Sequence, residues 1–366
     1  MKKISTLILF AAFALGAYAQ SDGYYHIKNT VTERYMVMAD NQYDFSAGTG
    51  TADVAAIITI KSLSEVNTHP GAVAYLKKVK GTEDQYDISA QGTSIGKGSN
   101  GKLYPHFTAV SGGYQIWGSY SGATEYLNDT PQDSGSETGK LTIKGTKART
   151  WKLYPIGKGD HYIGIKPMVH TNDGYWATIY CSFPFKLGSG MTAYYVNKVN
   201  KGGFQLKKVT DNVIAATFPV LVKLAGSSAS DNKITPMTSG GSEPSDNHLY
   251  GRYFDSSASK HVNRLAYNSR SMRVLGKDEN GKLAFVVASA SDLTDGAYIP
   301  HNRPYLEVSS GSADIMTEDG YTGIESIEAE EKADNKIYTL AGQELPANVT
   351  PKAGIYIKNG KKIVIK

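Results

Sequence analysis

The chain has 366 residues, 40% of them hydrophobic and 20% charged, with 38 Gly, 25 Tyr and a single Cys. This length predicts two or three domains, and the composition excludes collagen-like, disulfide-rich and disordered classes of protein. There are 39 Lys and Arg against 34 Asp and Glu, a formal net charge of +5. Because the basic residues are scattered along the chain, we expect no nucleic-acid partner.

The N-terminus has the pattern of a signal peptide over residues 1–19. Two lysines precede an almost continuous apolar stretch from Ile4 to Leu15, and Ala17 and Ala19 are small residues at the positions that a signal peptidase reads. We expect cleavage after Ala19 and a secreted or outer cell-surface location; the alternative is an ordinary buried N-terminal helix. The stretch is too short to span a bilayer and no later segment is longer, so we expect no transmembrane segment.

Short runs rich in Val, Ile, Thr and Tyr alternate with Gly, Asn and Asp clusters over residues 21–156, which predicts an all-β fold. The runs form three blocks that begin at Gly23, Gly71 and Gly112. A similar spacing between blocks indicates one supersecondary unit that is repeated until its copies close on each other.

The first and third blocks resemble ricin-type β-trefoil domains. Gly-Tyr-Tyr-His-Ile-Lys-Asn from Gly23, followed by Arg-Tyr-Met-Val from Arg34, is similar to the family's opening, and Gln115-Ile116-Trp117 matches its Gln-x-Trp signature. The resemblance implies an N-terminal β-trefoil over residues 21–156 with loops that bind sugar. In that family the tryptophan is usually a core residue, so the resemblance favours packing for Trp117, with a sugar platform as the alternative.

A second all-β domain is predicted over residues 158–314, with the inward-facing apolar pattern of a β-sandwich. Asn280-Gly281 separates two apolar runs and predicts a hairpin. The run Arg303–Val308 is the last strand expected there. The order of these segments resembles an accessory β-domain recurrent in exported proteins of Bacteroidota, a module to which no activity is attached.

The C-terminal end is predicted to be an acidic linker over residues 315–336 and a small β-hairpin module over residues 337–366. A two-residue turn at Asn359-Gly360 places Ile355 opposite Val364 and Tyr356 opposite Ile363. This ending resembles the short form of the sorting domain of type IX secretion cargo, which implies the secretion machinery as a partner. The alternative is a hairpin that completes the neighbouring domain.

The sequence carries no motif for covalent or metal chemistry. It has no Gly-x-Ser-x-Gly elbow, its histidines lack the spacing of metal ligands, and Cys181 lies in an apolar strand where we expect an inert thiol. The acidic loop over residues 128–137 is interpreted as a solvated turn, with a calcium loop as the alternative. We therefore expect no catalytic residue, no metal and no cofactor.

The sequence does contain aromatic residues together with amide and carboxylate residues in predicted loops. Such groups together bind sugars in proteins, so binding is the function that these residues favour. The candidate ligand-binding residues are Trp117, Tyr120, Tyr126, Asn128, Asp129, Tyr104, Asp40 and Asn41. We expect an exported, non-catalytic binding protein for a glycan or glycoprotein. The alternatives are a protein-partner binder, such as a proteinase inhibitor or host-interaction factor, and a carbohydrate-active enzyme with an inter-domain site.

Overall fold

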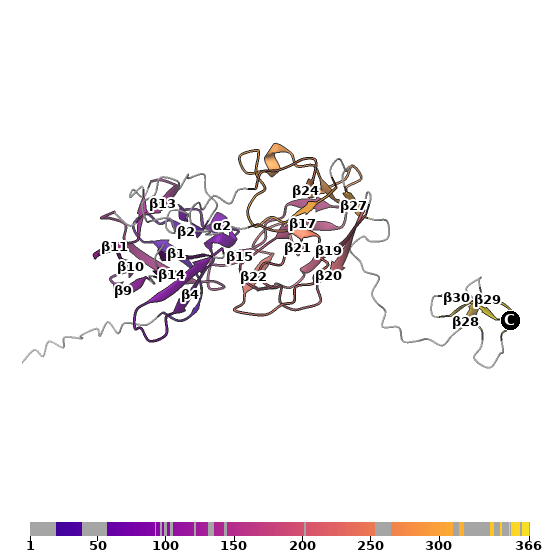
Figure 1. Ribbon diagram of the computed structural model, residues 1–366, viewed down its shortest axis with the longest axis horizontal. Helices are drawn as coiled ribbons and strands as arrows, with labels where there is room; N and C mark the ends of the chain where they lie inside the picture. The colour runs from indigo at the N-terminus through magenta and orange to yellow at the C-terminus, as the bar shows by residue number, and fades with distance from the viewer. Residues whose placement is uncertain are drawn as a thin grey trace, which may run out of the picture. The chain divides into compact units, whose positions relative to one another are not determined.

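The computed structural model is almost entirely β within the residues that it describes, which confirms the predicted all-β class (Figure 1). It has two compact units, Met1–Glu318 and Asp319–Lys366. The described residues are 20–38, 57–91, 93–95, 97–98, 101–102, 105–120, 122–130, 135–142, 145–200, 203–252, 265–309, 315–317, 337–339, 345, 351, 353–358 and 361–365. The predicted signal peptide and most of the predicted linker lie outside them.

The first unit begins with a sheet that we call the N-terminal sheet. Its described strands are β1 (Gly23–Asn29), β2 (Tyr35–Met38), β3 (Ile57–Ile60), β4 (Ala74–Lys78), β5 (Tyr86–Ala90), β6 (Thr93–Ile95), β9 (His106–Val110), β10 (Gly113–Tyr120), β11 (Ala123–Tyr126), β12 (Asn128–Thr130), β13 (Thr138–Thr142) and β14 (Thr150–Pro155). Strands β7 (Lys97–Gly98) and β8 (Gly101–Lys102) pair separately. Between β3 and β4 lie the short helix α2 (Leu63–Val66) and the 3-10 turn η2 (Pro70–Ala72).

Six of the described strands of this sheet close into a ring. Strand β1 pairs with β14 on one side and β4 on the other, β4 pairs with β5, and β10 pairs with both β9 and β14. The isolated bridge between Gln85 and His106 joins β5 to β9. Such closure leaves these strands no open edge for pairing with another chain. The threefold repeat of a β-trefoil stays a prediction.

Strands of this ring share one cluster of buried apolar side chains. Ile27, Leu76, Ile116 and Trp151 are all 0% exposed within it. The indole Nε1 of Trp151 donates a hydrogen bond to the Leu127 carbonyl oxygen at 3.0 Å, so the polar atom of this large ring is satisfied in the interior. Alternate residues of a strand point to opposite faces, so the neighbours of these core residues face outward.

The rest of the first unit is sandwich-like and is built on a second, ten-stranded sheet of described strands. In sheet order these are β16 (Val169–Thr171), β17 (Gly174–Ile179), β21 (Val220–Lys223), β19 (Thr192–Asn200), β20 (Gly203–Lys208), β27 (Ile315–Thr317), β25 (Leu283–Val286), β24 (Met272–Lys277), β26 (Tyr305–Glu307) and β23 (Leu249–Tyr250). A small sheet of β15 (Ile163–Gly164), β22 (Lys233–Pro236) and β18 (Phe185–Leu187) accompanies it, and the 3-10 turn η3 (Ala290–Asp292) precedes β26. Strand β27 continues the sheet into the first residues of the predicted linker.

The centre of this second sheet is buried on both faces. In β21, Val220 and Val222 belong to one apolar cluster, together with residues of the small sheet, whereas Leu221 belongs to another, together with residues of β24 and β25. All three side chains are 0% exposed. A strand that is covered on both faces has an uninterrupted run of apolar residues in its sequence, rather than apolar residues at every second position. The predicted hairpin around Asn280-Gly281 is confirmed, since β24 pairs with β25.

The second unit holds a three-stranded sheet of β28 (Ile337–Thr339), β29 (Gly354–Lys358) and β30 (Lys361–Ile365). Ile355 pairs with Val364 and Tyr356 with Ile363, as the turn residues predict. Ile355 and Val364 are 50% and 68% exposed, so one face of this hairpin presents apolar side chains to solvent. The sorting role of this module stays a prediction.

Candidate functional site

The candidate site is a row of three rings on the outward face of β9, β10 and β11, which we call the aromatic row: His106, Trp117 and Tyr126. Trp117 lies directly opposite His106 on one side and Tyr126 on the other. Directly opposed residues of antiparallel strands project from the same face, and the intervening Phe107 and Ile116 are buried in the core. The three rings therefore share the outer face.

Stacking orders these rings. The centroids of Trp117 and His106 are 4.2 Å apart with an interplanar angle of 11°, and those of Trp117 and Tyr126 are 6.5 Å apart at 46°. The indole Nε1 of Trp117 donates to Thr108 Oγ1 at 2.9 Å. The stacked contact with His106 and the hydrogen bond to Thr108 hold the Trp117 ring in a fixed orientation, so this part of the row is pre-organised.

Polar groups fix the His106 end of the row. His106 Nδ1 lies 2.9 Å from Asp84 Oδ2, and its Nε2 lies 2.9 Å from the Gln85 amide nitrogen. A carboxylate accepts only, so Nδ1 carries the proton, and in the neutral ring Nε2 accepts from Gln85. The Asp84 side chain is 43% exposed, so its second oxygen is open to a ligand hydroxyl.

A guanidinium covers the other end of the row. Arg149 lies over the Tyr126 ring, with its Cζ atom 4.6 Å from the ring centroid. Arg149 Nε donates to Asn128 Oδ1 at 3.2 Å, and its Nη2 donates to the Gly145 carbonyl at 2.6 Å. The row therefore ends in a carboxylate on one side and a cation on the other, with ring faces between them.

The structure brings together three of the residues predicted from sequence: Trp117 and Tyr126 are members of the row, and Asn128 supports it from beneath. Asn128 is fully buried, and its amide nitrogen donates to the Tyr126 carbonyl oxygen. Its bond to Arg149 then positions the guanidinium over Tyr126. Asn128 therefore acts through other side chains of the site.

Asp129 lies in the interior, away from the row. It is 0% exposed and forms a fully buried ion pair with Arg34, whose Nε lies 2.7 Å from Asp129 Oδ2. Thr59 Oγ1 donates to Oδ1 at 2.6 Å, and the Thr32 hydroxyl also donates to Oδ2. In this arrangement the Asp129 carboxylate bonds to the protein itself, and the residue joins β12 to the turn before β2 and to β3.

The remaining candidates are not placed in the site. Tyr104, Asp40 and Asn41 lie outside the described residues, and of Tyr120 only the backbone is described, paired with Ala123. Their binding roles stay predictions. Sequence reasoning missed Asp84, Gln85 and Arg149, because only the strand pairing brings these polar residues beside the rings.

A scan against protein-family models found no match to this chain, and a search of curated proteins found no relative. Within the part of the chain that the structure describes, no group of three or more His, Cys, Asp or Glu side chains is placed to hold a metal ion. No helix in that part is long and apolar enough to cross a membrane.

Proposed function

We propose that this chain is an exported, non-catalytic binding protein that recognises carbohydrate through the aromatic row. The observation that carries the proposal is the alignment of His106, Trp117 and Tyr126 across three neighbouring strands on the outer face. Pyranose rings present an apolar face that packs on aromatic rings, and their hydroxyls need fixed donors and acceptors beside that surface. Asp84 and Arg149 supply both kinds of group at the ends of the row.

Export and the use of the C-terminal module by a secretion machinery belong to the same proposal. They rest on the sequence of residues 1–19 and on the resemblance of residues 337–366 to a sorting domain.

A glycan array with the full chain tests the proposal. The wild type should bind a defined set of glycans, and Trp117→Ala should weaken that binding at least about tenfold, the equivalent of losing one ring contact worth about 1.4 kcal/mol. Trp117→Phe keeps a ring and should retain part of the affinity.

The matched control is Tyr250→Ala, which removes another surface aromatic. Tyr250 is 48% exposed and stacks on Tyr305 at 5.7 Å across two neighbouring strands, as Trp117 stacks on His106. Its loss should leave glycan binding unchanged. Either of two results would refute the proposal: the wild type binds no glycan, or Trp117→Ala binds glycan as tightly as the wild type does. Saturable binding to a protein, without competition by glycan, would favour the protein-partner alternative.

A further inference from the structure

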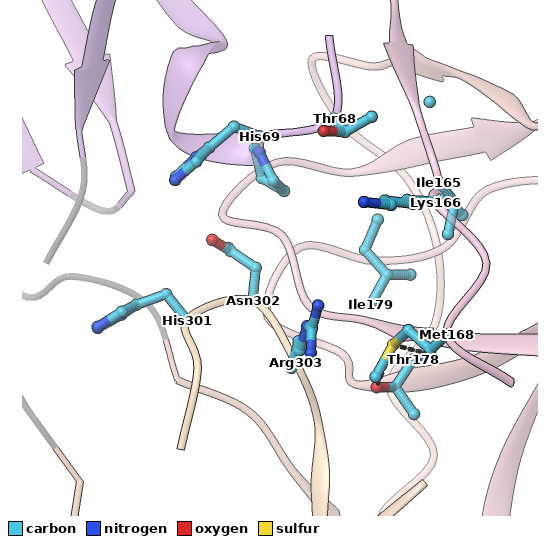
Figure 2. A pocket seen from close by; sticks show the side chains of 12 residues that line it. Thr68, His69, Ile165, Lys166, Met168, Thr178, Ile179, His301, Asn302 and Arg303 are labelled. Carbon is cyan, nitrogen blue, oxygen red and sulfur yellow. Dashed lines mark hydrogen bonds between the residues drawn. The ribbon is translucent and has the colours of Figure 1, made fainter. Parts of the chain in front are cut away.

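The first unit contains a cavity of about 210 Å³ where three segments distant in sequence meet (Figure 2). We call it the junction pocket. Its walls come from residues 68–70 after α2, from residues 164–179 around β15 to β17, and from residues 301–303 before β26. It therefore lies between the N-terminal sheet and the sandwich-like region, and it contains no part of the aromatic row.

Buried amides hold two of these walls together. Asn67 is 3% exposed; its side-chain amide nitrogen donates to the Asp160 carbonyl oxygen at 2.9 Å, and its backbone carbonyl oxygen accepts from the Gly164 nitrogen at 2.8 Å. A Cβ atom on Gly164 would lie 2.2 Å from the Ala229 carbonyl oxygen, so only glycine allows this approach. The hydrogen bond between Gly164 and Asn67 fixes this wall against the end of α2, and the close approach to Ala229 fixes it on the other side.

The third wall is fixed by a reciprocal amide pair. Gln91 Nε2 donates to Asn302 Oδ1 at 2.7 Å, and Asn302 Nδ2 donates to Gln91 Oε1 at 3.1 Å. Both residues have left-handed backbone, with φ of 48° and 60°. Asn302 Nδ2 also donates to the Tyr180 carbonyl at 2.7 Å. Asn302 is thereby held between the two sheets, which fixes the positions of His301 and Arg303 on either side of it.

The lining of the pocket is cationic at its opening. Lys166 and Arg303 are both exposed, and Figure 2 shows their charged ends directed toward the space between the walls. The pocket's lining residues include no Asp or Glu. Asp292, which interacts electrostatically with Arg303, lies outside that lining. Two cations with no carboxylate in the same lining favour an anion.

His69 adds a neutral donor. Its Nδ1 accepts a hydrogen bond from the Gly71 nitrogen at 3.0 Å, so in the neutral ring the proton is on Nε2. Burial lowers the pKa of His69 to about 4, and His301 lowers it as well, so the ring is neutral near pH 7. His69 therefore offers an N–H group to a ligand.

The floor of the pocket is apolar. Ile165 and Ile179 are 4% and 5% exposed, and Met168 packs against the same cluster. A volume of about 210 Å³ corresponds to roughly seven water molecules, which is the size of a small organic ion. The combination of a cationic opening and an apolar floor selects an ion that also has an apolar part.

We propose that the junction pocket is a second binding site, which takes a small organic monoanion with its charged group between Lys166 and Arg303 and its apolar part against Ile165 and Ile179. Carboxylates and phosphate or sulfate esters share this chemistry. The site is independent of the proposed carbohydrate function, because it uses no residue of the aromatic row.

Calorimetric titration of the full chain tests this site with three probes of similar size: butyrate, its neutral counterpart butanamide, and inorganic phosphate. We expect saturable butyrate binding in the millimolar range, at least about tenfold weaker binding of butanamide, and weakening by added salt. Phosphate that competes with butyrate would assign the site to anions in general, and phosphate that does not compete would assign it to carboxylates; both results support an anion site.

The variants Lys166→Gln and Arg303→Gln should each weaken butyrate binding about tenfold, since each removes one charge-assisted hydrogen bond. Both side chains are exposed, and unchanged urea midpoints will show that the variants fold. Arg270→Gln, an exposed arginine outside the lining, is the matched control and should bind as the wild type does. Trp117→Ala should also leave butyrate binding unchanged, which separates this site from the carbohydrate site.

Three results would overturn the proposal. The first is the absence of butyrate binding in the millimolar range. The second is equal affinity for butyrate and butanamide, since the charge would then contribute nothing. The third is an unchanged affinity in the chain that carries both Lys166→Gln and Arg303→Gln.

Discussion

Replacing Asp129 by Asn tests the interior role that the structure gives this residue. The substitution keeps the shape of the side chain and removes its charge, so the Arg34 guanidinium is left buried without its counterion; both side chains are 0% exposed. Asp129 Oδ2 accepts from both Arg34 Nε and the Thr32 hydroxyl, and Oδ1 accepts from Thr59. In the variant one of these two oxygens becomes an NH₂ group, so at least one hydrogen-bond donor of Arg34, Thr32 or Thr59 then faces another donor in place of an acceptor.

Loss of one partner from a buried ion pair costs about 3 to 5 kcal/mol, because the remaining charge stays desolvated. We therefore expect Asp129→Asn to lower the free energy of unfolding by about 4 kcal/mol, measured as a lower urea midpoint at constant slope. Arg34→Met should cost a similar amount. The chain with both substitutions should be more stable than the sum of the two single losses predicts, because it contains no unpaired charge.

Asp246→Asn is the matched control, because Asp246 pairs with Lys207 on the surface. The two charged atoms are 3.9 Å apart and the side chains are 46% and 52% exposed. Such a pair contributes at most about 1 kcal/mol. If Asp129→Asn cost no more than Asp246→Asn, the buried-pair account would be refuted. If Asp129→Asn instead abolished glycan binding at unchanged stability, Asp129 would be a ligand-binding residue, as its sequence position suggests.

Three further predictions concern stability and reactivity. Burial lowers the pKa of His26 to about 3, whereas an unfolded histidine titrates near 6.5, so the unfolded chain binds the additional proton between these values. The contribution of His26 to stability should therefore fall by about 5 kcal/mol as the pH drops through this window. Urea midpoints of His26→Gln should accordingly show a shallower pH slope than those of the wild type; equal slopes would contradict this. Gly71→Ala should cost about 3 kcal/mol, because its Cβ atom would lie 1.8 Å from the Met38 carbonyl oxygen. Gly118→Ala, whose Cβ atom would meet no atom within 4 Å, should cost far less, and similar melting temperatures for the two variants would refute the clash. The Cys181 thiol is 1% exposed and burial raises its pKa, so a thiol reagent should modify it only in denaturant, and rapid modification of the native chain would disprove its burial.

Local sequence patterns predicted the local structure well. The Asn359-Gly360 turn fixes the register of the C-terminal hairpin, where Ile355 pairs with Val364, and the run around Asn280 predicts the pairing of β24 with β25. Turn residues determine which strand positions oppose each other, and this information lies within about ten residues of chain. Strand β27 was not predicted, because the acidic residues that follow it suggest a linker.

The partners of the polar residues could not be predicted from sequence. Asp129 lies in an acidic stretch that has the composition of a surface loop, and its counterion Arg34 is 95 residues away. Likewise, the amide pair of Gln91 and Asn302 joins residues 211 positions apart. Sequence periodicity reports which face a side chain occupies and contains no information on long-range partners. The aromatic row was predicted only in part for the same reason: Trp117 and Tyr126 were among the sequence candidates, whereas Asp84 and Arg149 were not.

Tryptophan fluorescence during a glycan titration tests carbohydrate binding by the aromatic row most directly. Of the three tryptophans, Trp151 and Trp176 are 0% and 2% exposed, whereas Trp117 is half-buried on the outer face. A bound sugar that packs on the row should change the emission of Trp117 saturably, and Trp117→Phe should lose that change while the other two tryptophans still emit. The same emission change in Trp117→Phe, or glycan binding that leaves wild-type emission unaltered, would contradict the account.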